Sequence, residues 1–191
     1  MIVDEAYQIQ LNIEQVKLDN VQQFYYKCPP KGKIDFIKEL YVSFSKSTQT
    51  IIFVNTKSFA EKLFRTLKDD GYQVALIFGD MSKEERDEYI EKFRVGSINT
   101  IITTNLLSRG FDMHEIKLVI NFDVPSQENG TVPDHENYMH RIGRAGRFGD
   151  TGLALTLFDR EQDEKCFWSI INHYKMNDKV KNFEGGALQL K

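Results

Sequence analysis

Short apolar segments alternate along the chain with longer segments whose apolar residues recur at helical spacing. The segment TIIFV at 50–54 has the length and the β-branched residues of a buried strand. In the segment 33–44, apolar residues recur every three or four positions, which indicates one face of a helix. These patterns predict strands over 21–28, 50–54, 73–78, 99–104, 117–122 and 152–158. They predict helices over 33–44, 58–71, 83–95, 134–143 and 160–174.

Residues that start or stop regular structure stand at the boundaries of these segments. Pro29 and Pro30 end the first strand, because proline has no backbone N–H to donate. Gly71 follows the second helix, where a left-handed residue commonly ends a helix. Ser82 and Glu85 have the spacing of a capping box at the start of the third helix. The boundaries therefore agree with the periodicity.

Strands that alternate with helices predict an α/β fold. Right-handed strand–helix–strand units give a parallel sheet with helices on both faces. We expect one domain over 21–175, with a lead-in over 1–20 and a C-terminal tail over 176–191. Ligands of such sheets bind beyond the carboxyl ends of the strands. The candidate site residues are therefore those that directly follow strands.

Composition narrows the class of protein. The chain has 191 residues, 41% of them hydrophobic, which suffices for one core. No apolar run approaches the roughly 20 residues of a membrane span, and the N-terminus does not resemble a signal peptide. Cys28 and Cys166 have no metal-site spacing, which favours a reducing compartment. The net charge of −3 argues against nucleic-acid binding through bulk electrostatics, so any RNA contact must use a few placed groups.

The segment 138–152, YMHRIGRAGRFGDTG, carries the sharpest chemical signal. His140, Arg141, Arg144 and Arg147 are interspersed with glycines that end the helix and turn the backbone. Guanidinium groups held apart in this way suit a polyanion such as a phosphate chain. The alternative is an exposed basic loop without a ligand.

Three other segments follow predicted strands and are weaker signals alone. ITTNLLSRGFD at 102–112 places hydroxyl and amide groups at a strand end, followed by a carboxylate that could accept from a ribose hydroxyl. The alternative is a turn whose polar residues cap helices. In IIFVNTK at 51–57 the polar residues could likewise cap the next helix. In FGDMSKEER at 78–86 the final arginine could belong to a solvated face.

No G-x-x-x-x-G-K-[S/T] segment occurs anywhere in the sequence. A phosphate-cradling loop of that type is therefore missing, although the arginine-rich segment suits phosphates. The combination predicts half of a nucleotide site, with the other half on another domain.

In order, the segments IIFVNTK, FGDMSKEER, ITTNLLSRGFD, VINFDVP and YMHRIGRAGRFG resemble the C-terminal-domain motifs of DEAD-box ATP-dependent RNA helicases. The resemblance covers residues 14–175 and implies a RecA-like, P-loop NTPase-like three-layer sandwich without its own P-loop. It implies ATP with Mg²⁺, bound mainly by a separate N-terminal RecA-like domain, with RNA as a partner. We expect a monomer that does not bind membranes.

The resemblance also assigns roles residue by residue. Arg144 and Arg147 match arginine fingers that reach the γ-phosphate of ATP, and His140 matches a residue that couples to the acidic motif across the cleft. The remaining matches are Asp112 near the ATP ribose, Arg109 and Arg141 at the interdomain contact, and Thr56, Gly79, Arg86 and Thr104 on the RNA sugar-phosphate backbone.

The chain departs from the family pattern at three positions. Phe78 replaces a usual histidine, Lys83 replaces a common glutamine, and Asn105 replaces a common aspartate. None of these changes removes a phosphate-facing group, but Lys83 alters the expected RNA contact beside Arg86.

The chain inserts SQENGTVPDHEN at 126–137, which is longer than the corresponding segment of most members. With the TTN form at 103–105, this resembles mRNA-export helicases of the cytoplasm and the nuclear pore, which also occur in the nucleus. That subgroup implies a pore-associated activator with inositol hexakisphosphate. The alternatives are a translation-initiation-type RNA helicase, a stand-alone protein-docking module, and half of a DNA-translocating RecA-like enzyme.

Overall fold

The computed structural model describes residue 18 and residues 20–43, 48–104, 116–127, 130–146 and 150–184. The strands of its large sheet are β1 (Val21–Lys27), β2 (Thr50–Phe53), β3 (Val74–Ile77), β4 (Thr100–Thr103), β5 (Leu118–Asn121), β8 (Gly152–Phe158) and β9 (Val180–Asn182). The helices are α2 (Lys33–Ser43), α3 (Lys57–Asp69), α4 (Lys83–Arg94), α5 (His135–Ile142) and α6 (Glu161–His173). A small hairpin joins β6 (Ser126–Gln127) to β7 (Val132–Pro133).

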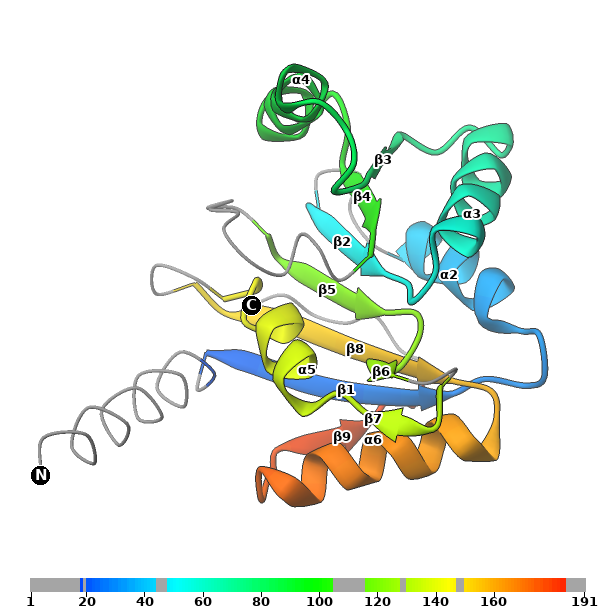
Figure 1. Ribbon diagram of the computed structural model, residues 1–191, viewed down its shortest axis with the longest axis vertical. Coiled ribbons are helices and arrows are strands. Elements are labelled where there is room, and N and C mark those ends of the chain that lie inside the picture. The colour runs from blue at the N-terminus through cyan, green and yellow to red at the C-terminus, as the bar shows by residue number, and fades with distance from the viewer. Residues whose placement is uncertain are drawn as a thin grey trace, which may run out of the picture.

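The large sheet is parallel throughout, in the order β3-β4-β2-β5-β8-β1-β9 (Figure 1). This confirms the predicted α/β fold, and the predicted strands and helices form with ends that agree within about two residues. The capping box of Ser82 and Glu85 is present at the start of α4. Gly71 has a φ of 84° directly after α3, so it supplies the left-handed turn expected there.

The core lies on both faces of the sheet because the central strands are apolar at successive positions. Along β2, Ile51 and Phe53 point to the face covered by α4, α5 and α6. Ile52, on the same strand, points to the face covered by α2 and α3. Side chains alternate between the two faces of a strand, so a strand buried on both sides must be apolar throughout. The result is a sandwich of three layers (Figure 1).

Three short strands were not predicted from the sequence. The hairpin of β6 and β7 lies within the inserted segment 126–137. Its backbone contacts α6, because Gln162 Nε2 donates a hydrogen bond to the carbonyl of Thr131 at 3.5 Å. β9 lies in the segment expected to be a tail and pairs in parallel with β1. The sheet therefore continues past residue 175, where we expected the domain to end.

Phe183 closes the core beside β9. Its side chain is buried, and its ring lies 5.7 Å from the ring of Phe36 and 6.1 Å from the ring of Tyr26, at steep angles. Such edge-to-face contacts are favourable beyond the area that they bury. Among the described residues, none of the helices combines the length and the apolar composition needed to cross a bilayer.

If β9 belongs to the core, Phe183→Ala should lower the free energy of unfolding by about 3 kcal/mol, because it removes a buried aromatic ring. Urea unfolding of the 191-residue chain measures this change. Val42→Ala is the matched control, since Val42 is 85% exposed, and it should change stability by no more than about 0.5 kcal/mol. A Phe183→Ala protein as stable as the control would show that the last strand contributes little.

Candidate nucleotide and RNA interface

The loops that follow the parallel strands lie together at the carboxyl edge of the sheet. Thr56 follows β2, Gly79 follows β3 and Thr104 follows β4, and these strands are neighbours in the sheet. Three of the four residues expected on the RNA backbone therefore share this edge. Thr56 also caps α3, because its hydroxyl accepts a hydrogen bond from the N–H of Phe59 at 3.3 Å. The capping role considered from the sequence is thus confirmed.

Arg86, the fourth of these residues, approaches the edge from α4. Its Nη2 donates to the carbonyl of Met81 at 3.1 Å and lies 3.5 Å from the carbonyl of Gly79. Within the described part of the chain, its buried Nε has no hydrogen-bond partner. The guanidinium group therefore braces the turn after β3 and does not project as a solvated charge.

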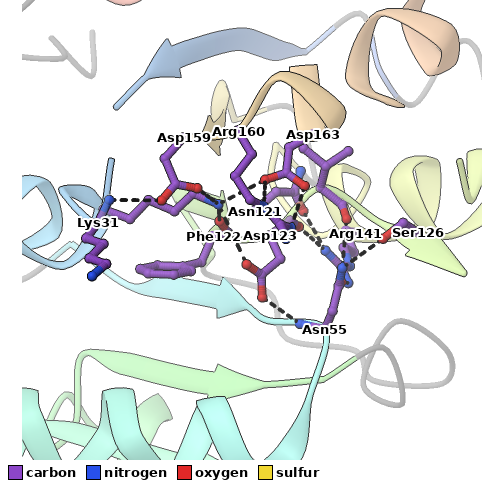
Figure 2. A network of polar contacts seen from close by, with 12 residues as sticks. Lys31, Asn55, Asn121, Phe122, Asp123, Ser126, Arg141, Asp159, Arg160 and Asp163 are labelled. Atoms are coloured by element: carbon purple, nitrogen blue, oxygen red, sulfur yellow. Dashed lines mark hydrogen bonds and ion pairs between the residues drawn. The ribbon is translucent and has the colours of Figure 1, made fainter. Parts of the chain in front are cut away.

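Arg141 lies inside the domain, with 0% of its surface exposed. Its Nη2 donates to the side-chain oxygen of Asn55 at 2.9 Å, and its Nη1 donates to the carbonyl of Asp123 at 2.9 Å (Figure 2). The guanidinium carbon is 5.2 Å from the ring centroid of Phe53, a cation–π distance. The sequence suggested an interdomain contact for Arg141, whereas the structure turns its guanidinium group toward its own sheet.

Burial lowers the pKa of Arg141 to about 9, and the nearby carboxylates of Asp123 and Asp134 partly oppose that change. The group therefore carries its charge at neutral pH. A charge in a protein interior is tolerated only when hydrogen bonds and opposite charges surround it. Asn55 and Asp123, one after β2 and the other after β5, supply these partners and so fix the position of α5 relative to both strands.

A second buried cation lies beside Asp123. The side chain of Lys33 is 7% exposed, and its ammonium lies 3.7 Å from Asp123 Oδ1 and 3.4 Å from Asp159 Oδ1. It also donates to the carbonyl of Phe122 at 2.9 Å. The other oxygen of Asp123 accepts from the backbone N–H of Asn55 at 2.9 Å. Lys33 thereby holds the carboxylate that orients the loop in front of Thr56.

The helix α5 carries His140 and leads directly to Arg144. Arg144 Nε donates to the carbonyl of His140 at 3.2 Å, so the arginine folds against the end of the helix. His140 Nδ1 is buried and, among the described residues, has no hydrogen-bond partner. Its Nε2 lies 3.9 Å from Glu136 on the same helix. The ring therefore packs its Nδ1 side into the domain, while Nε2 faces the exposed side chain of Glu136.

A tight approach after α5 sets the direction of the chain beyond Arg144. Gly146 has a φ of 68°, and a Cβ at this position would lie 2.8 Å from the carbonyl oxygen of Asn20. Only glycine fits both the left-handed backbone and the close contact. This observation supports the expectation that glycines turn the backbone around the arginines. Arg109, Asp112 and Arg147 lie outside the described residues.

Sequence reasoning assigned no role to Asn55, Asp123 or Lys33. The first two directly follow buried strands, in IIFVNTK and VINFDVP, so their positions were a usable signal. Lys33 offered no such signal, because it stands at the start of an amphipathic helix, where a charged residue is ordinary. Within the described residues, no three His, Cys, Asp or Glu side chains are grouped so as to hold a metal ion.

Comparison with known proteins identifies this architecture. The family described as the helicase conserved C-terminal domain matches residues 32–149, which is more than half of the chain. The chain therefore belongs to the helicase conserved C-terminal domain family. Within that family it is the RecA-like C-terminal domain of a DEAD-box helicase, of the type found in Dbp5 and DDX19.

Two curated relatives illustrate the similarity. DEAD-box helicase Dbp80 of Drosophila melanogaster is 38% identical over 183 residues, which cover 95% of this chain and 39% of the relative. ATP-dependent RNA helicase DDX19A of Homo sapiens is 36% identical over 184 residues, which cover 96% of this chain and 38% of the relative. The chain thus spans about two fifths of the length of these relatives.

Two solved structures show the same fold. S. cerevisiae Dbp5 bound to RNA and ADP BeF3 matches with a TM-score of 0.81 and 32% identity, over 96% of this chain and 49% of that chain. The C-terminal domain of a S. cerevisiae Dbp5 variant, bound to a Gle1 variant and IP6, matches with a TM-score of 0.74 and 34% identity. That match covers 85% of this chain and 89% of the other. The expected RecA-like fold is confirmed.

Replacing Arg141 with lysine keeps the charge but removes the planar fork that reaches two acceptors. Arg141→Lys should lower the free energy of unfolding by about 2 kcal/mol, because buried acceptors lose a donor. Urea unfolding measures the change. Arg94→Lys is the control, since the Arg94 side chain is 64% exposed and pairs only at the surface of α4. Equal stability of the two variants would contradict the structural role of Arg141.

Proposed function

We propose that this chain is the C-terminal half of an ATP-dependent DEAD-box RNA helicase. It supplies Arg144 and Arg147 as arginine fingers to ATP, which binds with Mg²⁺ mainly on an N-terminal RecA-like domain. The observation that carries this proposal is the fixed end of α5. Arg141 holds this helix to two strands, and Arg144 and Arg147 follow the helix in sequence, on either side of the turn at Gly146.

The remaining nucleotide contacts come from residues beside these arginines. His140 couples to the acidic motif of the other domain, and its side chain, 24% exposed on α5, supports a contact across the cleft. Asp112 lies near the ATP ribose and Arg109 makes an interdomain contact. The match to S. cerevisiae Dbp5 bound to RNA and ADP BeF3 supports nucleotide use by the two-domain protein.

RNA binds at the carboxyl edge of the sheet. Thr56, Gly79 and Thr104 contact the sugar-phosphate backbone, and Arg86 shapes the turn that carries Gly79. Contacts of this kind read the shape of the backbone and not the base sequence. Few groups suffice, which reconciles RNA binding with a net charge of −3.

In the mechanism that this proposal implies, the two domains close around ATP and RNA together. Closure brings the arginine fingers to the γ-phosphate, where their charge stabilises the transition state. The same closure bends one RNA strand and separates a short duplex, and hydrolysis followed by phosphate release reopens the cleft. In the domain described, the hydrogen bond between Arg141 and Asn55 joins the loop before Thr56 to the helix that precedes the finger arginines.

Within RNA metabolism, we assign the protein to mRNA export at the cytoplasmic face of the nuclear pore. The inserted segment 126–137 and the similarity to Dbp5 and DDX19 support this assignment over a translation-initiation helicase. The Dbp5 C-terminal domain bound to Gle1 and IP6 supports a pore-associated protein activator that uses inositol hexakisphosphate.

A protein-docking role is compatible with catalysis, since the β6–β7 hairpin stands on α6 and exposes Val132. Affinity for a protein activator, measured with and without residues 126–136, separates docking from catalysis. Circular dichroism must first show that the shortened protein keeps its helices. A DNA-translocating enzyme is excluded if RNA, and not DNA, stimulates ATP hydrolysis by the two-domain protein.

Because the sequence has no phosphate-cradling loop, the 191-residue chain alone should hydrolyse ATP at the background rate, with or without RNA. A phosphate-release assay on the purified chain measures this rate. RNA-stimulated turnover by the chain alone would refute the idea of a divided site.

In the full-length protein, Arg147→Ala should lower ATP turnover by about 10³–10⁵-fold, because a finger acts on the transition state. ATP affinity should be nearly unchanged, since the other domain holds the nucleotide. Steady-state turnover and binding of a fluorescent ATP analogue measure the two effects. Arg94→Ala, on the outer side of α4, is the control and should keep normal turnover.

A further inference from the structure

A lysine and an aspartate face each other across two of the loops proposed to contact RNA. Lys57 is the first residue of α3, directly after Thr56, and Asp80 directly follows Gly79. Lys57 Nζ donates to Asp80 Oδ2 in a short contact. Both side chains remain accessible, with 51% of Lys57 and 66% of Asp80 exposed. The ion pair therefore lies at the surface of the carboxyl edge.

Phe78 places the ammonium at this position. Lys57 Nζ lies 4.8 Å from the centroid of the Phe78 ring, and the phenylalanine itself is 8% exposed. The face of an aromatic ring attracts a cation. Because the phenyl ring has no lone-pair acceptor, the N–H groups of the ammonium can still donate to oxygen atoms. Phe78 is one of the positions at which this chain departs from the family pattern, where a histidine is usual.

The carboxylate of Asp80 is charged whenever the protein is near neutral pH. The hydrogen bond from Lys57 is the largest influence that holds the pKa of Asp80 below its ordinary value. The lysine thus faces an anion of its own chain. An ammonium has three protons in all, and its charge-assisted bonds to phosphate and to carboxylate are similar in kind.

We propose that Lys57 binds a phosphate of the RNA backbone, and that Asp80 is an internal competitor which the phosphate displaces. This inference rests on the proposed function, because it needs RNA at the carboxyl edge. The Thr56 hydroxyl and the Gly79 backbone flank the pair along the chain, so a phosphate near either one is close to the lysine. Asp80 thus weakens RNA binding by competing with the phosphate for Lys57, and other contacts between the protein and RNA must offset this competition.

A second lysine–aspartate pair provides a matched control. Lys38 lies 2.7 Å from Asp70, with 34% and 42% of the two side chains exposed. Asp70 is the C-cap of α3, whereas Lys57 stands at its first turn, so the two pairs lie at opposite ends of one helix. Asp70→Asn makes the same charge change as Asp80→Asn but away from the proposed RNA edge.

The test measures the affinity of the full-length protein for a fluorescein-labelled single-stranded oligouridine of about ten nucleotides, a length near the site size of single-strand binders. Fluorescence anisotropy is recorded with ADP BeF3 across a range of salt concentrations. Asp80→Asn should tighten binding by about two- to fivefold, the effect expected of one exposed ion pair. Asp70→Asn should leave the affinity at the wild-type value.

Lys57→Met should weaken binding and reduce the slope of log K against log salt by about 0.7, the value for one phosphate contact on a single strand. Lys57→Arg should retain most of the affinity, because it keeps the charge. The double variant Lys57→Met, Asp80→Asn should bind no more tightly than Lys57→Met alone, since Asp80 acts through the lysine.

Three outcomes would overturn the inference. Asp80→Asn could bind like the wild type, it could tighten binding equally without Lys57, or Lys57→Met could leave the salt slope unchanged. If Thr104→Ala weakens binding in the same assay while these outcomes occur, the proposed RNA edge survives and only the role of Lys57 fails. A wild-type protein that binds no RNA in any nucleotide state would refute both proposals.

Discussion

A buried guanidinium group needs acceptors on several sides, because an unpaired charge in a protein interior is strongly unfavourable. Arg141 meets this need by drawing together Asn55 after β2, Asp123 after β5 and the ring of Phe53. These partners come from two neighbouring strands, while Arg141 comes from the helix that crosses that face of the sheet. The requirement to satisfy one cation thus fixes the helix that leads to His140 and Arg144 against the loop that leads to Thr56.

The same edge shows how a chain of net negative charge can arrange cations without excess charge. Lys33 is surrounded by carboxylates within 4 Å, and Arg160 holds Asp163 through two hydrogen bonds. Lys57 is matched by Asp80 in the same way. Lys33, Arg160 and Lys57 therefore each have an anion of their own chain beside them, which weakens their long-range attraction for RNA. Affinity then depends on groups that are placed close to the backbone and not on a basic surface.

Periodicity and turn chemistry sufficed to predict most of the fold. The strands of the sheet centre are apolar throughout, and the helices carry clear caps, such as Ser82 with Glu85 and Thr56 before α3. Residues 180–182 gave no such signal, because a strand of three residues with two exposed side chains has no visible period. Its place in the sheet depends on Phe183, whose aromatic partners are distant in sequence.

The candidate site was predicted in part for a similar reason. Position after a strand pointed to the loops at the carboxyl edge, and the resemblance to DEAD-box helicases supplied roles for them. Neither could show that Arg141 faces inward, since His140 and Arg144, close to it in the sequence, are similar in polarity. Burial is a property of tertiary packing, and only the arrangement of α5 against β2 and β5 determines it.

The order of strands in the sheet has a consequence for how the domain is made in the cell. Among the described strands of the large sheet, β1 comes first in the sequence, and it pairs with β8 and β9, the last two (Figure 1). During translation, the apolar residues of β1 therefore have no neighbouring strand to pair with until β8 and β9 have been synthesised. Pairing between such distant segments is slow and leaves strands open to aggregation. Of the strands in this sheet, β1 is thus separated from its partners by the longest stretch of chain.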